Sequence, residues 1–439
     1  MARVARTVAP VTQPGYTGIA AIHTVSSVVI LTILGSVSPA AVTAFGLAQT
    51  VYGLALALAS GLTIATVGAL TQRRGSTSAR TDVTSTVGSM LAVARVSTVA
   101  LVTLVVLTGT MLVVVLEGST ARLLAAAYAG LVLSCAVVPW YQVVTGVLQV
   151  AGRESTALKI SVCSVAASLA LAAGARSLTD DPTVLVLVVG ATTSICKLLG
   201  ALVSRRAARD LVDWQGAGHV ARGALRDDLR RTVRRLPRAV APSLDVIPLM
   251  TTFAVATAVA STVSEEVGAT TATVIALLRT VIVPLKAFGV VAGRLTRVCS
   301  PSPAAEVRES ARIVGVLLCL SVTTGVAVVL FREPVAVALG LPLHLGPAVV
   351  AVAGAQLVLE AVTGVGNTML KVLVAPTALL AEITVVMWGL AVPALVVVAA
   401  TGPSAGLVWG VLLGARCVFA VLVVRAWWRW SRTSRPGTA

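Results

Sequence analysis

Residues 7–72 read TVAPVTQPGYTGIAAIHTVSSVVILTILGSVSPAAVTAFGLAQTVYGLALALASGLTIATVGALTQ and contain no Asp, Glu, Lys or Arg. A helix of about 20 residues crosses the ~30 Å hydrocarbon core of a membrane, so this stretch is long enough for two membrane-spanning helices. Long apolar runs with short polar connections continue as far as residue 424. The pattern predicts an all-α integral membrane protein rather than a chain with a single cleaved signal.

The overall composition agrees with a membrane protein. Hydrophobic residues make up 57% of the chain and charged residues 12%, and the mean hydropathy is +0.96, whereas a soluble domain carries about 25% charged residues. Six cysteines are present, and their spacing forms neither a disulfide framework nor a metal site. Five of them lie inside apolar runs: Cys135, Cys163, Cys196, Cys319 and Cys417.

The net charge of +17 first suggests an anionic partner such as nucleic acid. The Lys and Arg side chains, however, concentrate in alternate connections between the apolar runs, and ten arginines lie between Arg205 and Arg238. Short cytoplasmic loops of membrane proteins carry this excess of positive charge. We therefore expect a multi-pass protein of the cell (inner) membrane with both termini in the cytoplasm. The lipid bilayer, and not nucleic acid, is the expected partner.

Twelve membrane spans are expected, in two sets of six around the basic stretch 205–238. They lie near residues 14–36, 40–70, 88–116, 123–150, 156–175, 183–204, 239–263, 267–293, 311–331, 346–370, 375–400 and 403–424. The predicted domains are an N-lobe (1–204), a basic cytoplasmic linker (205–238), a C-lobe (239–428) and a cytoplasmic tail (429–439).

An internal repeat is expected between the two lobes. The tetrapeptide VTGV occurs at residues 144–147 in the fourth span and again at 362–365 in the tenth. Because six spans separate equivalent helices, these have the same membrane orientation. The two six-helix lobes are therefore predicted to be related by a pseudo-two-fold axis along the membrane normal, with a cavity between them.

The linker alternates Arg and Asp at helical spacing, as in Arg226, Asp227, Arg230 and Arg231. This spacing predicts a helix at the membrane surface. Two interpretations of its charge remain open: a stripe that faces solvent or headgroups, and a binding site for anionic lipid.

Four short motifs occur in order along the spans: residues 35–48 (GSVSPAAVTAFGLA), 72–75 (QRRG), 148–153 (LQVAGR) and 364–368 (GVGNT). In this order they resemble motifs of the multidrug and toxic compound extrusion (MATE) transporters, within the superfamily that also contains lipid-linked oligosaccharide flippases. The resemblance runs over almost the whole chain. It implies two lobes that work by alternating access, driven by a cation gradient.

The family resemblance also points to candidate ion sites. Many members carry an aspartate in the first helix, but the matching position here is near Ile30, and His23 is the only side chain of that span that ordinarily titrates near neutral pH. Other members use acids in the seventh and tenth spans, where this sequence has Asp245 and Glu360. The resemblance therefore favours a C-lobe site.

Charged side chains within spans are costly, about 2.5–3.5 kcal/mol each on insertion scales, so each needs a partner, a water-filled cavity or a function. Five of those in the C-terminal half are candidates for function: Asp245, Arg279, Lys286, Glu360 and Glu382. We predict Glu360, Asp245 and Glu382 as ion-coupling residues. Arg279 and Lys286, seven residues apart on one helix face, are predicted to line the substrate cavity. Static ion pairing that holds the C-lobe helices together is the alternative.

The N-lobe supplies further candidates for the wall of the substrate cavity: His23, Gln49, Tyr52, Tyr141 and Gln142. Hydrogen bonding between helices without a transport role is the alternative. Pro139 precedes Tyr141 and Gln142 and can kink the fourth span. Lys197 and Arg416 are expected to pair with acids or to reach toward the membrane surface.

No phosphate-binding loop, zinc motif or nucleophile elbow is present in the sequence, so an enzyme or a primary pump is not expected. The predicted function is secondary active efflux of a small amphipathic compound by H⁺ or Na⁺ antiport, with no metal and no cofactor other than the coupling ion. The protein is expected to be monomeric. A flippase for a lipid-linked saccharide and a non-transporting membrane scaffold are the alternatives.

Overall fold

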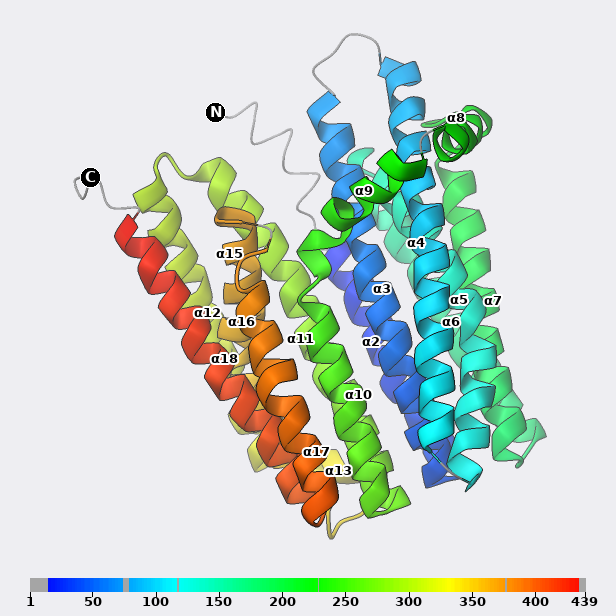
Figure 1. Ribbon diagram of the computed structural model, residues 1–439, viewed down its shortest axis with the longest axis vertical. Coiled ribbons are helices and arrows are strands. Elements are labelled where there is room, and N and C mark those ends of the chain that lie inside the picture. The colour runs from blue at the N-terminus through cyan, green and yellow to red at the C-terminus, as the bar shows by residue number, and fades with distance from the viewer. Residues whose placement is uncertain (1–14, 74–78, 117, 228, 376, 434–439) are drawn as a thin grey trace. The chain divides into compact units, whose positions relative to one another are not determined.

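The computed structural model describes residues 15–73, 79–116, 118–227, 229–375 and 377–433. Within these residues every regular element is a helix (Figure 1). A segment surrounded by hydrocarbon must satisfy its backbone hydrogen bonds within itself, and a helix does so. The all-α prediction is confirmed. Part of the QRRG motif and the end of the predicted tail lie outside the described residues.

By its internal packing the chain divides into two compact units. The first contains Met1–Ile22 and Ala48–Val246, and the second contains His23–Leu47 and Ile247–Ala439. The turn between the first two spans thus packs with the C-terminal half of the chain. The predicted lobes 1–204 and 239–428 follow the sequence instead, and these functional boundaries stay a prediction.

The spans before the linker are α2 (Gly15–Gly35), α3 (Pro39–Arg73), α4 (Ala79–Val115), α5 (Gly118–Val150), α6 (Glu154–Leu178) and α7 (Pro182–Ala207). The linker contains α8 (Trp214–Asp227), α9 (Leu229–Val240) and the short helix η2 (Ala241–Ser243). Helix α5 continues through Pro139 without a break.

The later spans begin with α10 (Val246–Val263), α11 (Glu265–Cys299) and α12 (Pro303–Leu330), and a short helix α13 (Arg332–Ala338) follows. The next span consists of α14 (Gly346–Val358), η3 (Ala361–Gly366) and α15 (Asn367–Leu373). The last two spans are α16 (Leu380–Thr384) with η4 (Val385–Ala391) and α17 (Val392–Thr401), and α18 (Ala405–Thr433).

Twelve apolar segments of the described chain match the twelve predicted spans. Ten helices are long and apolar enough to cross a membrane, the bent pair Gly346–Val358 and Ala361–Leu373 makes an eleventh span, and α2 contributes the shorter apolar segment Ala21–Gly35. The seventh span begins at Val246 and not near residue 239, because α9 and η2 extend to Ser243.

The glycine-rich first hairpin packs closely in the second unit. A Cβ atom on Gly46 would lie 2.6 Å from the Cβ atom of Ala272 in α11, and one on Gly268 would lie 2.9 Å from the hydroxyl oxygen of Thr43. Both positions therefore require glycine for the helices to approach. This close contact gives a physical reason for the motif GSVSPAAVTAFGLA.

The LQVAGR motif ends α5 with a glycine in the left-handed region. Gly152 has φ of +74°, its N–H donates to the carbonyl of Gln149 at 3.0 Å, and the N–H of Arg153 donates to the carbonyl of Leu148 at 2.9 Å. This pair of bonds satisfies carbonyl groups that would otherwise remain unpaired at the end of a helix. The motif therefore terminates the helix.

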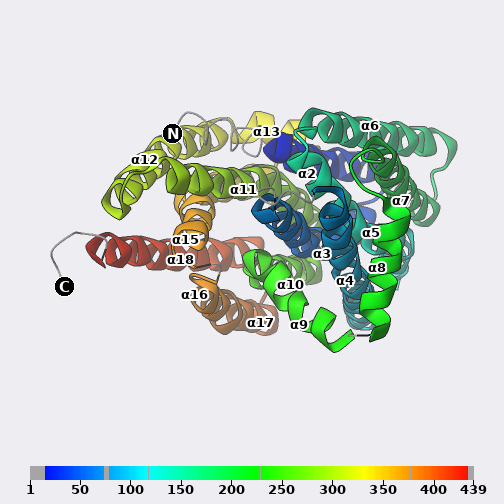
Figure 2. The same cartoon turned by 90° about the horizontal axis from the view of Figure 1, so that it is seen from above.

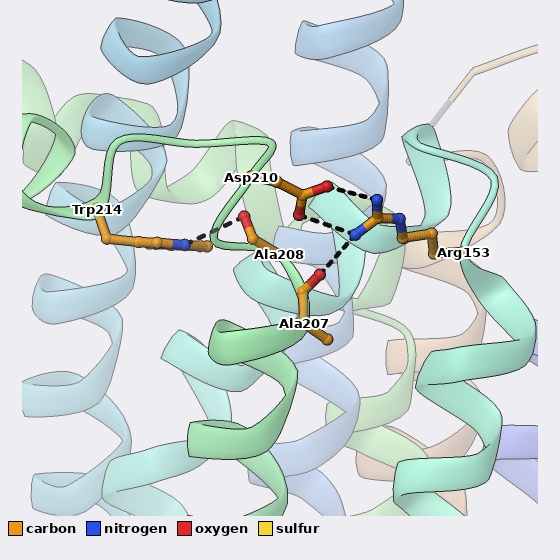
Figure 3. A network of polar contacts seen from close by, with 5 residues as sticks. All are labelled: Arg153, Ala207, Ala208, Asp210 and Trp214. Carbon is orange, nitrogen blue, oxygen red and sulfur yellow. Dashed lines mark hydrogen bonds and ion pairs between the residues drawn. The ribbon is translucent and has the colours of Figure 1, made fainter.

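The Arg153 side chain then ties this turn to the end of α7 (Figure 3). Its Nη1 donates to the carbonyl of Ala207 at 2.7 Å and to Asp210 Oδ1 at 2.9 Å, and its Nη2 donates to Asp210 Oδ2 at 2.5 Å. These hydrogen bonds lower the pKa of Asp210 below its usual value. The ion pair between Arg153 and Asp210 is therefore fully formed at neutral pH. It is lost only as the pH falls through the lowered pKa of Asp210.

The predicted surface helix is present as α8 and α9. Helix α8 lies beside α4 (Figure 2). Its Ala217 and Ala221 pack in the hydrophobic core of the first unit, and Gly88 allows α4 to approach it closely. Arg222 and Arg226 of α8 are exposed. The helical prediction is therefore confirmed, with one face of α8 packed and another exposed. Its place at the membrane surface stays a prediction, and so does the choice between a solvated stripe and a lipid site.

Helices α5 and α7 cross at a pair of glycines in the first unit. A Cβ atom on Gly130 would lie 2.8 Å from Gly190 Cα and 2.8 Å from the carbonyl oxygen of Leu187. One turn along, Ser194 Oγ donates to the carbonyl of Gly130 at 2.6 Å and lies 2.9 Å from Ser134 Oγ. Small residues and hydroxyl bonds of this kind hold helices together in membranes.

Replacing Gly130 with Ala should destabilise the protein by about 1–3 kcal/mol, because the atoms in the way belong to the backbone and cannot rotate aside. The apparent melting temperature of the detergent-purified protein would report the loss. Gly174→Ala in α6 is the matched control, since a Cβ atom there meets nothing within 4 Å. Equal melting temperatures for the two variants would contradict this account of the crossing.

Candidate functional site

Glu360 lies at the joint of a bent span. Helix α14 ends at Val358, the π-helical turn η3 begins at Ala361, and the two segments Gly346–Val358 and Ala361–Leu373 meet at 43°. Bends and π-helical turns leave backbone groups away from regular pairing and frequently occur at functional sites. The predicted ion-coupling residue therefore occupies the least regular part of its helix.

Glu360 forms a buried ion pair with Arg416 of α18. Arg416 Nη2 donates to Glu360 Oε2 at 2.9 Å, and the hydroxyl of Thr363 donates to the same oxygen at 3.2 Å. Glu360 is 1% exposed and Arg416 is 2% exposed. Among the described residues of the second unit, Glu360 is the only buried carboxylate. A buried charge without a partner is costly. The guanidinium of Arg416 and the carboxylate of Glu360 each reduce the cost of burying the other.

Gln356 lies one helical turn before Glu360 and is 2% exposed. Within the described residues its side-chain amide has no hydrogen-bond partner, and neither have Glu360 Oε1, Arg416 Nε and Arg416 Nη1. Glu360 Oε1 lies against the bare Cα of Gly364, where a Cβ atom would collide with it. The cluster of Gln356, Glu360, Thr363 and Arg416 is hereafter called the Glu360 cluster.

The first unit contains a related arrangement. Gln142 precedes the first VTGV by two residues, as Glu360 precedes the second. Gln142 Oε1 accepts a hydrogen bond from the hydroxyl of Thr63 at 2.5 Å. The ammonium of Lys197 in α7 lies 5.1 Å from the centre of the neighbouring Tyr141 ring. A buried basic side chain, Lys197 or Arg416, thus accompanies the repeated motif in each unit.

Several of the remaining predicted residues belong to the first unit. Asp245 is 2% exposed and Gln49 is 6% exposed, whereas Tyr52 is half-buried. Tyr141 is buried and Gln142 is half-buried. All five lie in the segment Ala48–Val246 of that unit.

The other predicted residues belong to the second unit. Arg279 is 7% exposed in α11. Lys286 lies two helical turns later on the same helix and is half-buried. His23 is half-buried in α2, and Glu382 is exposed in the first turn of α16. Of these four side chains, only that of Arg279 is fully buried.

The sequence-predicted residues are thus brought together only in part. Glu360 meets a buried base, but its partner is Arg416 and not the predicted Arg279 or Lys286. Asp245 belongs to the first unit and Glu360 to the second, so a single cluster of three acids and two bases stays a prediction.

Sequence reasoning missed Gln356. It expected Arg416 to pair with an acid or to reach the membrane surface, but it did not name Glu360 as that acid. The extended repeat QVVTGV (142–147) and EAVTGV (360–365) is the signal that singles out Glu360, because it aligns this carboxylate with the half-buried Gln142 of the first unit. No comparable signal marks Gln356, which lies outside the repeated hexapeptide.

Comparison with known proteins gives matches in structure only. No protein-family model matches the chain, and no curated protein matches it in sequence. A MATE transporter solved in a bent conformation superposes with a TM-score of 0.66 at 17% identity, over 98% of this chain and 96% of that one. An inward-facing MATE family transporter of the MOP superfamily gives a TM-score of 0.69 at 16% identity, over 97% and 96% of the two chains.

This chain has the MATE fold. The likeness covers nearly the full length of both chains, so the predicted layout of twelve helices in two lobes is confirmed. At 15–17% identity the likeness establishes the fold alone. Another protein with the MATE fold is a MOP superfamily transporter from Pyrococcus furiosus, with a TM-score of 0.65 at 16% identity over 97% of this chain and 95% of that one. It is described as having a binding pocket of reverse polarity that suggests a different function.

Removing one charge of the Glu360 cluster should be more harmful than removing both. Glu360→Gln or Arg416→Gln leaves the other charge buried and uncompensated, at a cost of about 3–5 kcal/mol, whereas the double variant leaves no charge. Thermal unfolding of the four proteins in detergent forms a double-mutant cycle. Glu309→Gln and Arg425→Gln remove exposed charges of the same unit and serve as controls. Additive losses in the cycle would show that the two side chains do not interact.

Proposed function

We propose that the protein is a secondary transporter that exports a small amphipathic compound across the cell membrane, and that it is not an enzyme. The MATE fold and the membrane-spanning helices support transport. The observation that carries the proposal is the buried Glu360–Arg416 ion pair at the bend of a span. A charge pair in hydrocarbon has a large cost, and a transport role accounts for it.

The same comparison supports alternating access. Proteins that share the fold are described in an inward-facing and in an outward-facing conformation. A protein that alternates between two such states needs a group whose free energy depends on the bound ion. We assign this role to Glu360, because its carboxylate lies where the regular hydrogen bonding of the helix is interrupted. Asp245 and Glu382 remain the further candidates for ion coupling.

The coupling ion is proposed to be H⁺ rather than Na⁺. The guanidinium of Arg416 lies 2.9 Å from one oxygen of Glu360, and two positive charges at such short range repel each other strongly in a buried site. A Na⁺ ion at Glu360 would have to remain beside that charge. A proton instead converts the carboxylate to a neutral acid, which needs no further ligands.

Substrate contacts are proposed for the side chains already predicted for the cavity: His23, Gln49, Tyr52, Tyr141, Gln142, Arg279 and Lys286. All of them are buried or half-buried. The distribution of basic residues supports termini in the cytoplasm, and a monomer in the lipid bilayer is the proposed working form.

Flipping of a lipid-linked saccharide is the second candidate. Four basic side chains within the described spans are buried: Lys197, Arg279, Lys371 and Arg416. They would suit an anionic headgroup better than an organic cation. The Pyrococcus furiosus transporter, whose pocket is described as having reverse polarity, is a precedent for a different function in this fold.

Transport by the reconstituted protein tests the proposal. Proteoliposomes with an acidic interior should accumulate a small fluorescent amphiphile, with ethidium as the cationic probe and fluorescein as the anionic one. Glu360→Gln should reduce the initial rate about tenfold or more, equivalent to at least ~1.4 kcal/mol in the barrier. Glu309→Gln, which replaces an exposed carboxylate of α12, should transport at the parent rate.

Each result separates the candidates. Accumulation of either probe that collapses with the proton gradient supports antiport. Flipping of a fluorescent phospholipid without movement of either probe would favour the flippase. No movement of any probe by correctly folded parent protein would contradict transport and favour a scaffold.

A further inference from the structure

The Glu360 cluster contains more unpaired polar atoms than a buried site normally holds. Gln356, Glu360 and Arg416 are each at most 2% exposed. Within the described chain, five of their atoms have no hydrogen-bond partner: Gln356 Nε2, Gln356 Oε1, Glu360 Oε1, Arg416 Nε and Arg416 Nη1. Buried polar groups are nearly always paired with protein, water or ligand. The cluster is therefore suited to hold a polar guest.

The unpaired atoms favour a guest that accepts hydrogen bonds. Arg416 Nε and Nη1 can only donate, and Gln356 Nε2 donates as well. These three nitrogens outnumber the two unpaired oxygens. A small anion accepts several hydrogen bonds at once, and a guanidinium is well suited to bind it. A metal cation would instead meet the positive charge of Arg416.

Charge balance links this guest to a proton. With Glu360 ionised, the pair carries no net charge, and Arg416 already has its anion. If Glu360 takes a proton from water, the carboxylate charge disappears and Arg416 is left as a buried, uncompensated cation. A second anion restores neutrality by accepting the hydrogen bond that Arg416 Nη2 had donated to Glu360.

We infer that the Glu360 cluster takes up a proton and a small anion together, the proton on the carboxylate of Glu360 and the anion on the guanidinium of Arg416. The net charge of the cluster is zero before and after this step. The inference rests on the proposed function for its use of Glu360 as the proton site. It adds that the proton enters with an anion, so this half of the exchange is electrically neutral.

The other acids on the elements packed against α14, η3 and α18 do not replace Glu360. These carboxylates lie near the starts of their helices and are exposed or half-buried: Glu265, Glu266, Glu306, Glu309, Glu333 and Glu382. His344, in the turn between α13 and α14, is exposed as well. A group that already contacts water gains a proton without leaving a buried charge behind, so it would not require an anion.

The same elements carry more basic than acidic side chains. The bases of the helices next to the cluster are Arg279, Lys286, Arg294, Arg297, Arg308, Arg312, Arg332 and Lys371, and those of α18 beyond Arg416 are Arg425, Arg429 and Arg432. Of this set, only Arg279 and Lys371 are buried. A surplus of bases over acids in this unit favours uptake of an anion over that of a cation.

Anion binding to the full-length protein in nanodiscs tests the inference. Chloride and benzoate are each titrated calorimetrically into protein in buffers free of chloride, between pH 5 and 8. These titrations give the affinity for each anion. Repeating them in buffers of different ionisation enthalpy gives the number of protons taken up. We expect affinity for at least one anion to rise as the pH falls, by up to about tenfold per pH unit, with one proton bound per anion. Chloride alone would identify an inorganic anion site, and benzoate alone a carboxylate site.

The variants make the two parts of the inference separable. Glu360→Gln should bind the anion with an affinity that no longer depends on pH, because its side chain is neutral throughout. Arg416→Gln should lose anion binding, and the double variant, which leaves no buried charge, should fold and also lose it. Arg425→Gln removes an exposed guanidinium from the same helix and should bind like the parent.

Three results would overturn the inference: no binding of either anion by the folded parent, binding that does not depend on pH in the parent, or binding retained by the folded double variant. Because the measurement is one of binding, its failure leaves transport untouched. If the probe accumulates in proteoliposomes but no anion binds, the joint uptake of a proton and an anion is rejected and the proposed transport stands. Anion binding without any accumulation would reject the proposed transport and keep the site.

Discussion

A hydrocarbon interior offers no hydrogen-bond partner to a backbone or a side chain, and this constraint governs the whole molecule. It requires helices across the membrane, because only their backbone bonds are complete within one segment. It also makes the burial of a polar side chain in hydrocarbon unfavourable in free energy, unless that side chain finds a partner within the protein. The regular spans obey this constraint with apolar surfaces and hydroxyl bonds between neighbouring helices, such as Ser134 with Ser194. Departures from it are therefore informative.

The largest departure lies around Glu360. There a bent span, a π-helical turn and a buried ion pair occur within a few residues of each other. Any one of these features has an ordinary explanation in packing. Together they place a charge that can be neutralised beside backbone that is not held by regular hydrogen bonds. A change in the charge of Glu360 would therefore act on the part of the helix that resists movement least.

The internal repeat places a related polar arrangement in each unit. The segments QVVTGV and EAVTGV give Gln142 and Glu360 equivalent positions, and each unit has a buried base on a later helix, Lys197 or Arg416. In the first unit the base lies over the ring of Tyr141. In the second it pairs with a carboxylate. The same motif thus accompanies a contact between a base and an aromatic ring in one unit and an ion pair in the other.

The sequence by itself determined the helical class, the twelve spans and the resemblance to MATE transporters, because hydrophobic length and loop charge are local properties that the chain displays directly. It also singled out Glu360, since a carboxylate in a span is rare. The tertiary structure alone decided that Arg416 and not Arg279 or Lys286 pairs with Glu360, and that the first hairpin packs with the C-terminal half. These contacts join residues far apart in sequence, and helical periodicity gives the face of a helix but not the neighbour that the face will meet.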